Sequence, residues 1–266
     1  MDSLNGVPTD LLRNDLSEKV VLISGGGSGI GAAIAEAFGR YGAKVGIHYH
    51  HSDFQVVLEC ATRICAAGGE AFPLQADLSS SSAVKKMIDK TIEHFGRLNI
   101  LVNNAGSMVD RRRLEDVDDD FIDQVFNLNA RSVVTACHTV LPAFAAQGGG
   151  CIVNVSSISA STGGSPGSSV YSASKAFVST LTRSLARELA DRNIRVNAIS
   201  PGTIDTVFHQ QFSNRDKLEK TRLSIPLQRL GTAADCAGTV LYLASDSLSG
   251  YVTGQVIEVN GGQLMA

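Results

Sequence analysis

The sequence predicts an α/β protein with a doubly wound parallel sheet of about seven strands and helices on both faces. Short, nearly continuous apolar runs alternate with segments that carry apolar residues at helical spacing. Strands that are apolar throughout are typical of a parallel sheet whose two faces are both covered by helices. No long linker or charge block interrupts this alternation in the 266 residues, so we expect a single domain.

The expected elements follow in a regular order after a polar N-terminal tail over residues 1–16. The first strand, KVVLISG, leads into the helical pattern GIGAAIAEAFGRYGA, which stops at Gly42. The second strand, KVGIHY, precedes the helix DFQVVLECATRICAAGG, which closes on glycines. Five further strands are expected in the runs EAFPLQAD, LNILVNNAG, GCIVNVSS, IRVNAISPG and GQVIEVNGG, and helical stretches separate most of them.

Charge and composition argue against several classes of partner. A net charge of −3 gives no electrostatic attraction for nucleic acid or an anionic membrane, so neither is expected. The one basic run, Arg111–Arg113, is followed by EDVDDD, which favours a solvated face of mixed charge. The start of the chain lacks the apolar core of a signal peptide and no run of 18 apolar residues exists, so we expect a cytoplasmic protein.

Cysteine and histidine patterns predict no metal. The five cysteines are odd in number, scattered and without zinc spacing, which indicates a reducing compartment and buried thiols. The run HYHH, His48 to His51, would alternate between the two faces of a strand, and this disfavours a shared metal site.

Glycine-rich or polar residues follow five of the expected strands. They are Gly25–Gly31, Asp77, Asn103–Gly106, Ser156–Ser157 and Pro201–Gly202. Ligands of open parallel sheets bind beyond the carboxyl ends of the strands, so these residues predict one continuous cleft.

The turn SGGGSGIG between the first strand and helix favours nucleotide binding over a merely tight turn. Gly25, Gly29 and Gly31 have G-x-x-x-G-x-G spacing, which lets the backbone approach a ligand. The N-terminus of the following helix presents free N–H groups to phosphate.

The stretch YSASK places Tyr171 and Lys175 four residues apart, on one face of a helix. A neighbouring ammonium favours phenolate and would bring the phenol pKa towards neutrality. This pair alone is a weak motif, because its spacing also occurs by chance.

Together with NNAG, the Asn of NLNARS, VSS, NAISPG and GYVTGQVIEVNGG, these motifs resemble the short-chain dehydrogenase/reductase family of NAD(P)-dependent oxidoreductases. The resemblance covers about residues 17–264. It implies a Rossmann fold, with a catalytic domain over 17–266 and a mobile substrate lid at about 206–227. Two positions depart from the usual pattern. Ser24 stands where Thr is common, and Ser157 lies fourteen residues before Tyr171 instead of thirteen, an extra residue that the loop STGGSPGSS can absorb.

The resemblance implies hydride transfer between a nicotinamide and a carbonyl or secondary alcohol. Tyr171 would be the general acid/base, and Lys175 would lower its pKa and hold the nicotinamide ribose. Ser157 would orient the substrate oxygen. Asn129 would hold a water that links Lys175 to solvent.

The resemblance also implies the residues that contact the cofactor. They are Gly25, Gly29 and Ile30 around the pyrophosphate, Ser28 in the same turn, Asp77 and Leu78 at the adenine, Asn103, Ala105 and Gly106 on the adenosine side, and Tyr171, Lys175, Pro201, Gly202, Ile204 and Thr206 around the nicotinamide. A carboxylate at the end of the second strand would mark NAD, but His50 and His51 follow Tyr49 there. We therefore expect NADP(H), with His50 or His51 near the 2′-phosphate. NAD(H) stays the alternative, since Ser28 replaces a basic residue that many NADP-preferring members carry.

The substrate is a small carbonyl or alcohol whose identity the sequence does not reveal. Its pocket is expected to include Ser107, Met108, Ser157, Ser159 and His209. Carrier-protein β-ketoacyl reductases are similar, although the neutral stretch AAQGGG stands where several of them carry basic residues. A non-catalytic NADP(H)-binding regulator is the alternative from another class. The resemblance further implies a homotetramer.

Overall fold

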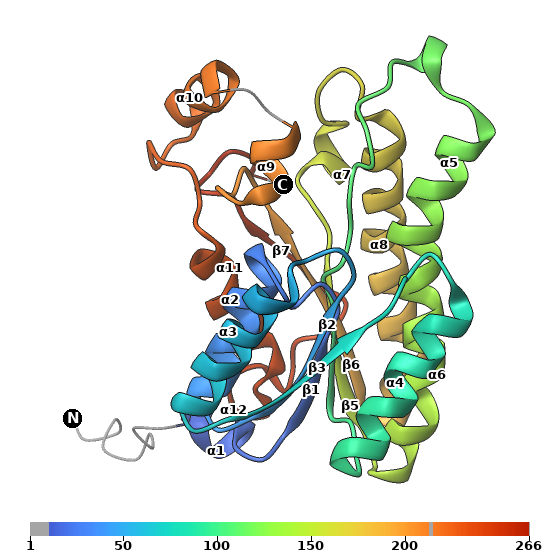
Figure 1. The fold of residues 1–266 in the computed structure, drawn as a ribbon, viewed down its shortest axis with the longest axis vertical. Helices are drawn as coiled ribbons and strands as arrows, with labels where there is room; N and C mark the ends of the chain where they lie inside the picture. Colours follow the sequence, from blue (N-terminus) through green and yellow to red (C-terminus); the bar gives the residue numbers. More distant parts are fainter. Residues whose placement is uncertain (1–10, 213–214, 266) are drawn as a thin grey trace.

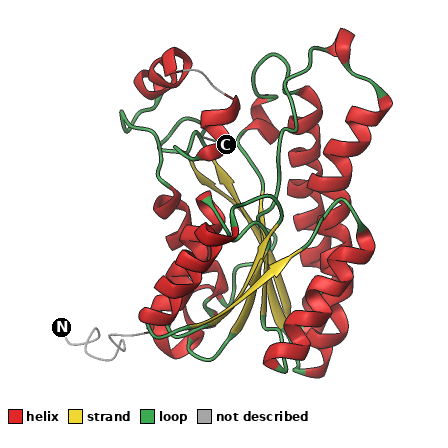
Figure 2. Ribbon diagram, in the orientation of Figure 1, coloured by secondary structure: helices red, strands yellow, loops and turns green. Residues whose placement is uncertain are grey.

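A single parallel sheet of seven strands forms the centre of the molecule, in the order β3-β2-β1-β4-β5-β6-β7 (Figures 1 and 2). The computed structural model describes residues 11–212 and 215–265, without the side chains of His209 and Gln210. The strands are β1 Val20–Ile23, β2 Lys44–Tyr49, β3 Glu70–Gln75, β4 Ile100–Asn103, β5 Gly150–Val155, β6 Ile194–Pro201 and β7 Val256–Val259. The predicted fold class is confirmed.

Helices cover both faces of the sheet (Figure 1). The helices α2, α3 and α11 pack on one face, and α4, α6 and α8 pack on the other. Their bounds, with the shorter helices, are α1 Leu11–Leu16, α2 Gly29–Arg40, α3 Phe54–Ala66, α4 Ser81–Phe95, α5 Asp119–Phe126, α6 Ser132–Ala146, α7 Ser159–Thr162, α8 Ser169–Glu188, α9 Val207–Phe212, α10 Arg215–Ser224, α11 Ala233–Ala244 and α12 Asp246–Ser249. Short 3₁₀ turns lie at Leu114–Asp116 and Ala190–Arg192, and a π-helical turn lies at Asn127–Arg131.

The strands carry apolar residues on both faces because each face of the sheet has its own core. In β1, Val21 and Ile23 join the core under α2, α3 and α11, whereas Val20 and Leu22 join the core under α4, α6 and α8. All four side chains are fully buried. Each such side chain contributes about 1.5–3 kcal/mol to stability, so the two cores hold the strand ends in place.

The edge strand β3 accommodates a proline. Pro73 lies opposite Ile47 of β2 and has no strand on its other side among the described residues. A proline lacks the N–H that a central strand would need, so an edge is the position that tolerates it.

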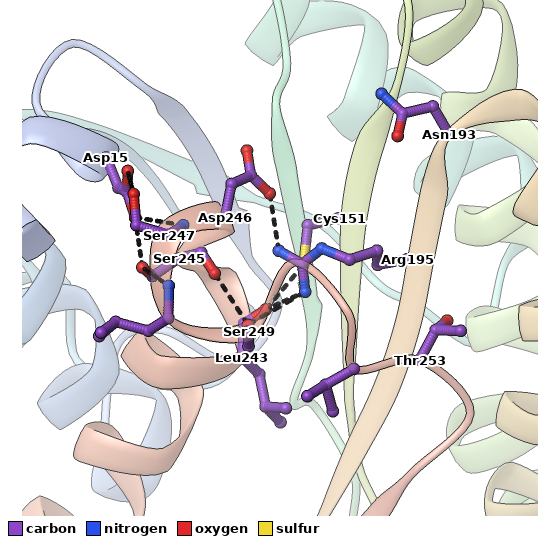
Figure 3. Close-up of polar contacts among 12 residues, drawn as sticks. Asp15, Cys151, Asn193, Arg195, Leu243, Ser245, Asp246, Ser247, Ser249 and Thr253 are labelled. Atoms are coloured by element: carbon purple, nitrogen blue, oxygen red, sulfur yellow. Dashed lines mark hydrogen bonds and ion pairs between the residues drawn. The ribbon is translucent and has the colours of Figure 1, made fainter.

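Residues 11–16 differ from the expected polar tail. They form the helix α1, and Leu16 is fully buried in the core beneath it. The carboxylate of Asp15 accepts hydrogen bonds from Ser245 Oγ, from Ser247 N at 2.9 Å and from Ser247 Oγ at 2.8 Å (Figure 3). Burial would raise the pKa of Asp15, but these hydrogen bonds outweigh it and lower the pKa. Residues 1–10 lie outside the described part of the chain.

Arg195 closes the end of the sheet where β6 begins (Figure 3). Its Nη1 donates to the carbonyl of Leu243 at 2.7 Å and to Ser249 Oγ at 3.2 Å, and its Nη2 donates to Asp246 at 2.9 Å. The guanidinium therefore ties β6 to α11 and α12. The candidate site lies at the opposite end of the sheet, where the strands end.

Candidate active site

A cleft of about 750 Å³ opens at the carboxyl ends of the strands. It brings together most of the residues that the sequence predicts for the site. These are Gly25, Ser28, Gly29, Ile30, His50, His51, Leu78, Ala105, Gly106, Ser107, Met108, Ser157, Ser159, Tyr171, Lys175, Pro201, Gly202, Ile204 and Thr206. Asp77, Asn103 and Asn129 do not line it. His209 belongs to α9, but its side chain lies outside what the structure describes.

The glycine-rich turn leaves backbone donors facing the cleft. No described residue accepts a hydrogen bond from the N–H of Gly29, Ile30 or Gly31, the first residues of α2. A Cβ at Gly31 would collide with the carbonyl of Gly25, so only glycine fits there. Thr206 lies across from Gly29, in contact distance of a Cβ placed on that glycine. This is a cradle for a phosphate group.

His48 fixes this turn, and the sequence analysis did not identify it as a site residue. Its Nδ1 accepts the N–H of Gly25 at 2.9 Å, and its Nε2 donates to the carbonyl of Ala76 at 3.0 Å. These two bonds require a neutral ring with the proton on Nε2. Burial lowers the pKa of His48 to about 4. The signal was present in the sequence, since His48 directly follows the apolar run VGI within the second strand.

The side chains of Asn103 and Asp77 form hydrogen bonds within the protein, and their place at the cofactor stays a prediction. The amide of Asn103 donates to Asn154 Oδ1 at 2.9 Å inside the sheet, because the last residue of β4 points into the protein. Its neighbour Asn104 lines the cleft instead and donates to the carbonyls of Ser24 and Gly25. Asp77 accepts from Ser79 N at 2.9 Å, and that contact lowers its pKa.

Three hydroxyl groups form a hydrogen-bonded chain beside the cleft. Ser157 Oγ accepts from Ser159 Oγ at 2.9 Å and from Ser159 N at 3.1 Å. With both acceptor positions taken, the Ser157 proton points to the phenol of Tyr171, with which it forms a hydrogen bond. Burial raises the pKa of Tyr171 to about 12, and the bond from Ser157 opposes this only in part.

The raised pKa of Tyr171 differs from the expectation that Lys175 lowers it. The ammonium of Lys175 donates to the carbonyl of Val155 at 2.8 Å and lies 5.9 Å from the centre of the tyrosine ring. Burial lowers the pKa of Lys175 itself to about 8. Burial is the main cause of both pKa shifts, and neither group is among the causes of the other's shift.

Asn129 supports the site from beneath. It lies in the π-helical turn, is fully buried, and holds both main-chain groups of Ser107: its Oδ1 accepts from Ser107 N at 2.9 Å and its Nδ2 donates to Ser107 O at 2.8 Å. Its amide also reaches Ser174 Oγ at 3.2 Å. Both amide hydrogens are used, so the role visible here is to position the loop at Gly106, where a Cβ would lie 3.0 Å from Lys175 Nζ.

Histidines line the wall of the cleft next to β2, and the carboxylate of Asp77 behind them interacts with both. The rings of His50 and His51 lie 3.7 Å apart at the end of β2 and line the cleft with Ser52. None of the described residues that line the cleft is an Asp or Glu. Such a lining suits an anionic ligand.

The basic run Arg111–Arg113 forms the solvated face of mixed charge that the sequence predicts only in part. Arg112 pairs with Asp110 and Asp118 and lies 4.6 Å over the ring of Phe121. Arg113 is exposed, whereas Arg111 is half-buried and lines the cleft.

The observed donors match a nicotinamide dinucleotide. Backbone N–H groups for phosphate, a lysine near the phenol and an apolar wall at Ile204 lie along one cleft. Among residues 11–212 and 215–265 no group of three His, Cys, Asp or Glu side chains could hold a metal ion. In the same residues, no helix has the length and hydropathy to cross a bilayer.

Comparison with known proteins gives consistent results. The family model described as enoyl-(acyl carrier protein) reductase matches residues 25–263. The 3-oxoacyl-[acyl-carrier-protein] reductase FabG of Thermotoga maritima is 39% identical over 251 residues, covering 93% of this chain and 98% of its own. A short-chain type dehydrogenase/reductase of Mycobacterium marinum has a TM-score of 0.89 and 34% identity, covering 97% and 99%. The NADH-dependent reductase A1-R′ complexed with NAD has a TM-score of 0.84 and 33% identity, covering 96% and 100%.

Proposed function

The chain belongs to the short-chain dehydrogenase/reductase family, and from this membership we propose a catalytic role for each residue of its cleft. It is an NAD(P)-dependent oxidoreductase that transfers a hydride between nicotinamide and a carbonyl or secondary alcohol. The observation that carries the assignment of roles is the chain Ser159–Ser157–Tyr171 beside Lys175.

Tyr171 is the general acid in reduction and the general base in oxidation. A raised pKa keeps the phenol protonated near neutral pH, so it is ready to donate its proton to a carbonyl oxygen. The Ser157 hydroxyl, held by Ser159, donates to the same oxygen and orients it. The bound cofactor supplies the hydride.

Lys175 holds the ribose hydroxyls next to the nicotinamide, and Asn129 holds the loop that Lys175 contacts. A water that links Lys175 to solvent, next to Asn129, would return the proton to Tyr171. Gly29 and Ile30 would hold the cofactor phosphates, opposite Thr206.

NADP(H) is the preferred cofactor. The support is the absence of a carboxylate among the described lining residues and the placement of His50 and His51 where β2 ends. A carboxylate there would repel a 2′-phosphate and bind the 2′-hydroxyl of NAD instead.

The segment 206–227 acts as a lid over the substrate. It contains α9 and α10, and its residues Thr206, Phe208, Lys217 and Leu218 line the cleft. The substrate pocket includes Met108, Ser159 and, on α9, Val207, Phe208 and Gln211. His209 of the same helix is proposed for the pocket as well.

A 3-oxoacyl thioester is the second candidate substrate, because the curated relative of T. maritima carries that activity in its name. We further propose a homotetramer in the cytoplasm. Exposed apolar side chains on α5, α6 and α8, among them Ile122, Val134 and Phe177, support an interface between copies, and five free cysteines suit a reducing compartment. A monomer in light scattering would contradict the tetramer.

The test is oxidation of NADPH, with NADH in parallel, against a 3-oxoacyl thioester, a keto-sugar, a diketone and a quinone. Turnover of any of them establishes the activity of the site, and the pattern names the substrate class. Tight NADPH binding without turnover of any carbonyl would favour a non-catalytic regulator and would contradict the roles given to Tyr171 and Ser157.

A further inference from the structure

Arg111 is held at the substrate side of the cleft by its Nε and Nη1 atoms, and its Nη2 atom makes no hydrogen bond to a described residue. Its Nε donates to the carbonyl of Phe212 at 2.8 Å, and its Nη1 donates to Ser165 Oγ at 2.9 Å and to the carbonyl of Pro166 at 3.3 Å. No described residue accepts a hydrogen bond from Nη2. Three of the five N–H donors therefore fix the group in place, and the two on Nη2 remain for a ligand.

The loop that receives Arg111 is built around left-handed glycines. Gly163, Gly164 and Gly167 have φ values of 76°, 74° and 81°, which only glycine adopts readily. The carbonyl of Gly167 accepts the N–H of Arg112 at 3.2 Å, so the loop and the arginine run hold each other. This loop is the glycine-rich stretch between α7 and α8.

A series of ring contacts connects Arg111 to the general acid. The rings of Tyr171 and Phe208 lie 5.7 Å apart, and those of Phe208 and Phe212 lie 5.0 Å apart. Arg111 bonds to the main chain of Phe212. The arginine is therefore on the Tyr171 side of the cleft, among residues of the lid.

The charge of Arg111 has no carboxylate to balance it among the described residues. Lys217 of α10 donates to the same Ser165 Oγ at 3.0 Å, so two cations meet at one hydroxyl. Burial lowers the pKa of Arg111, and burial together with the charge of Arg111 lowers the pKa of Lys217. A partly buried guanidinium with no described carboxylate beside it is costly unless an anion joins it.

We infer that Arg111, with Lys217, binds a carboxylate on the substrate, so that the enzyme reduces oxo acids in preference to neutral ketones. The free N–H groups of Arg111 Nη2 can donate charge-assisted hydrogen bonds to a carboxylate. The apolar ring of Phe208 lines the cleft beside Tyr171, where the carbon chain between the two ends would lie. The inference rests on the proposed function of the same site, because it assumes that Tyr171 acts on the carbonyl.

The test compares acids with their own esters. Initial rates are measured with NADPH for 3-oxobutanoate, 4-oxopentanoate and 5-oxohexanoate, and for the three methyl esters. We expect at least one acid to exceed its ester in kcat/KM by about 10- to 100-fold, the range for one charge-assisted contact, mainly through a lower KM. Equal values for every acid and ester, or a preference for the esters, would overturn the inference.

Variants assign the effect to the arginine. Arg111→Gln should reduce the acid-to-ester ratio of kcat/KM by about tenfold or more, and Arg111→Lys should restore part of it. Lys217→Gln should reduce the ratio less. Arg113→Gln is the matched control, because this exposed arginine of the same run does not line the cleft. A ratio that Arg111→Gln leaves unchanged would give Arg111 a structural role only.

A binding measurement separates this inference from the proposed function. With NADPH present, hexanoate should raise the Tm of the wild type more than hexanamide does, and Arg111→Gln should remove that difference. Should no carbonyl compound be reduced, the proposed function fails, and this shift still decides the inference. Equal shifts for hexanoate and hexanamide would overturn it.

Discussion

The ring of His48 binds the glycine-rich turn through Gly25, whose N–H it accepts at 2.9 Å on Nδ1. Protonation of Nδ1 would destroy that bond, and the pKa of His48 is lowered to about 4. The unfolded chain, with an ordinary histidine pKa near 6.5, takes up the proton first as the pH falls. His48 thus contributes stability that is complete above about pH 6.5 and is lost as the pH falls through about 4.

Urea unfolding of the wild type and of His48→Gln across pH 4 to 7 measures this contribution. The wild type should lose up to about 3 kcal/mol more of its free energy of unfolding than the variant over that range. His138→Gln is the control, because His138 is exposed on α6. If the free energies of unfolding of the wild type and of His48→Gln depend on pH in the same way, the stabilising role of the hydrogen bond from Gly25 to His48 is refuted.

Tyr171→Phe should abolish turnover and keep the cofactor bound. The substitution removes the proton donor but leaves the ring that packs 5.7 Å from Phe208. We expect kcat to fall by about 10²- to 10⁴-fold, the contribution of a positioned general acid. NADPH binding by fluorescence should stay within a few-fold of wild type. Tyr251→Phe, at a fully exposed tyrosine, serves as the control. Turnover within about tenfold of wild type would refute the assignment.

Lys175→Met should make the protein more stable while it removes activity. The ammonium is buried, with its pKa lowered to about 8, so below pH 8 the folded state carries a charge at a cost. Removing the charge should raise the free energy of unfolding at pH 7 by about 1–3 kcal/mol. The loss of the hydrogen bond to the carbonyl of Val155 offsets part of this gain. In the wild type alone, Lys175 should add stability as the pH rises from 8 to about 10.5. Lys86→Met on the exposed side of α4 should change neither quantity, and a destabilised Lys175→Met would count against this account.

The double substitution of His50 and His51 by alanine should reduce the preference for NADPH. These rings border the end of β2, where we place the 2′-phosphate. The ratio of kcat/KM for NADPH to that for NADH should fall by about tenfold, as expected for the loss of a charge-assisted contact. His138→Ala leaves this region untouched and is the control. If the wild type has nearly equal kcat/KM values for NADPH and NADH, the proposed preference for NADPH is refuted.

Asp15→Ala should detach α1 from α12. The carboxylate accepts three hydrogen bonds from Ser245 and Ser247 and is lost entirely in the variant. The expected cost is about 1–2 kcal/mol in free energy of unfolding, measured by urea titration. Asn14→Ala, at an exposed neighbour on the same helix, should cost less than half as much, and equal costs would show that only helix propensity is involved.

The sequence predicted the sheet and the cleft because both depend on local patterns. Apolar runs such as VVLI define strands, and strand ends in a parallel sheet share one edge, so most of the predicted residues lie in one cleft. It did not predict the helix at residues 11–16, whose stability comes from the distant Ser245 and Ser247.

The sequence also did not predict which way the side chains at the strand ends point. Whether Asn103 or Asn104 faces the cleft depends on where β4 stops, and a shift of one residue reverses the two faces. The burial that raises the pKa of Tyr171 depends on the assembled walls of the cleft and not on its spacing from Lys175.

The strand order sets a condition on how this chain folds. β1 pairs with β2 early in the sequence, but its other neighbour is β4, with Val21 opposite Ile100. During synthesis one edge of β1 therefore stays unpaired until β4 has left the ribosome. Such non-local pairing is slow, and an unpaired apolar edge is where nascent chains associate. Expression of this protein should respond to chaperone supply and to growth temperature more strongly than its final stability would suggest.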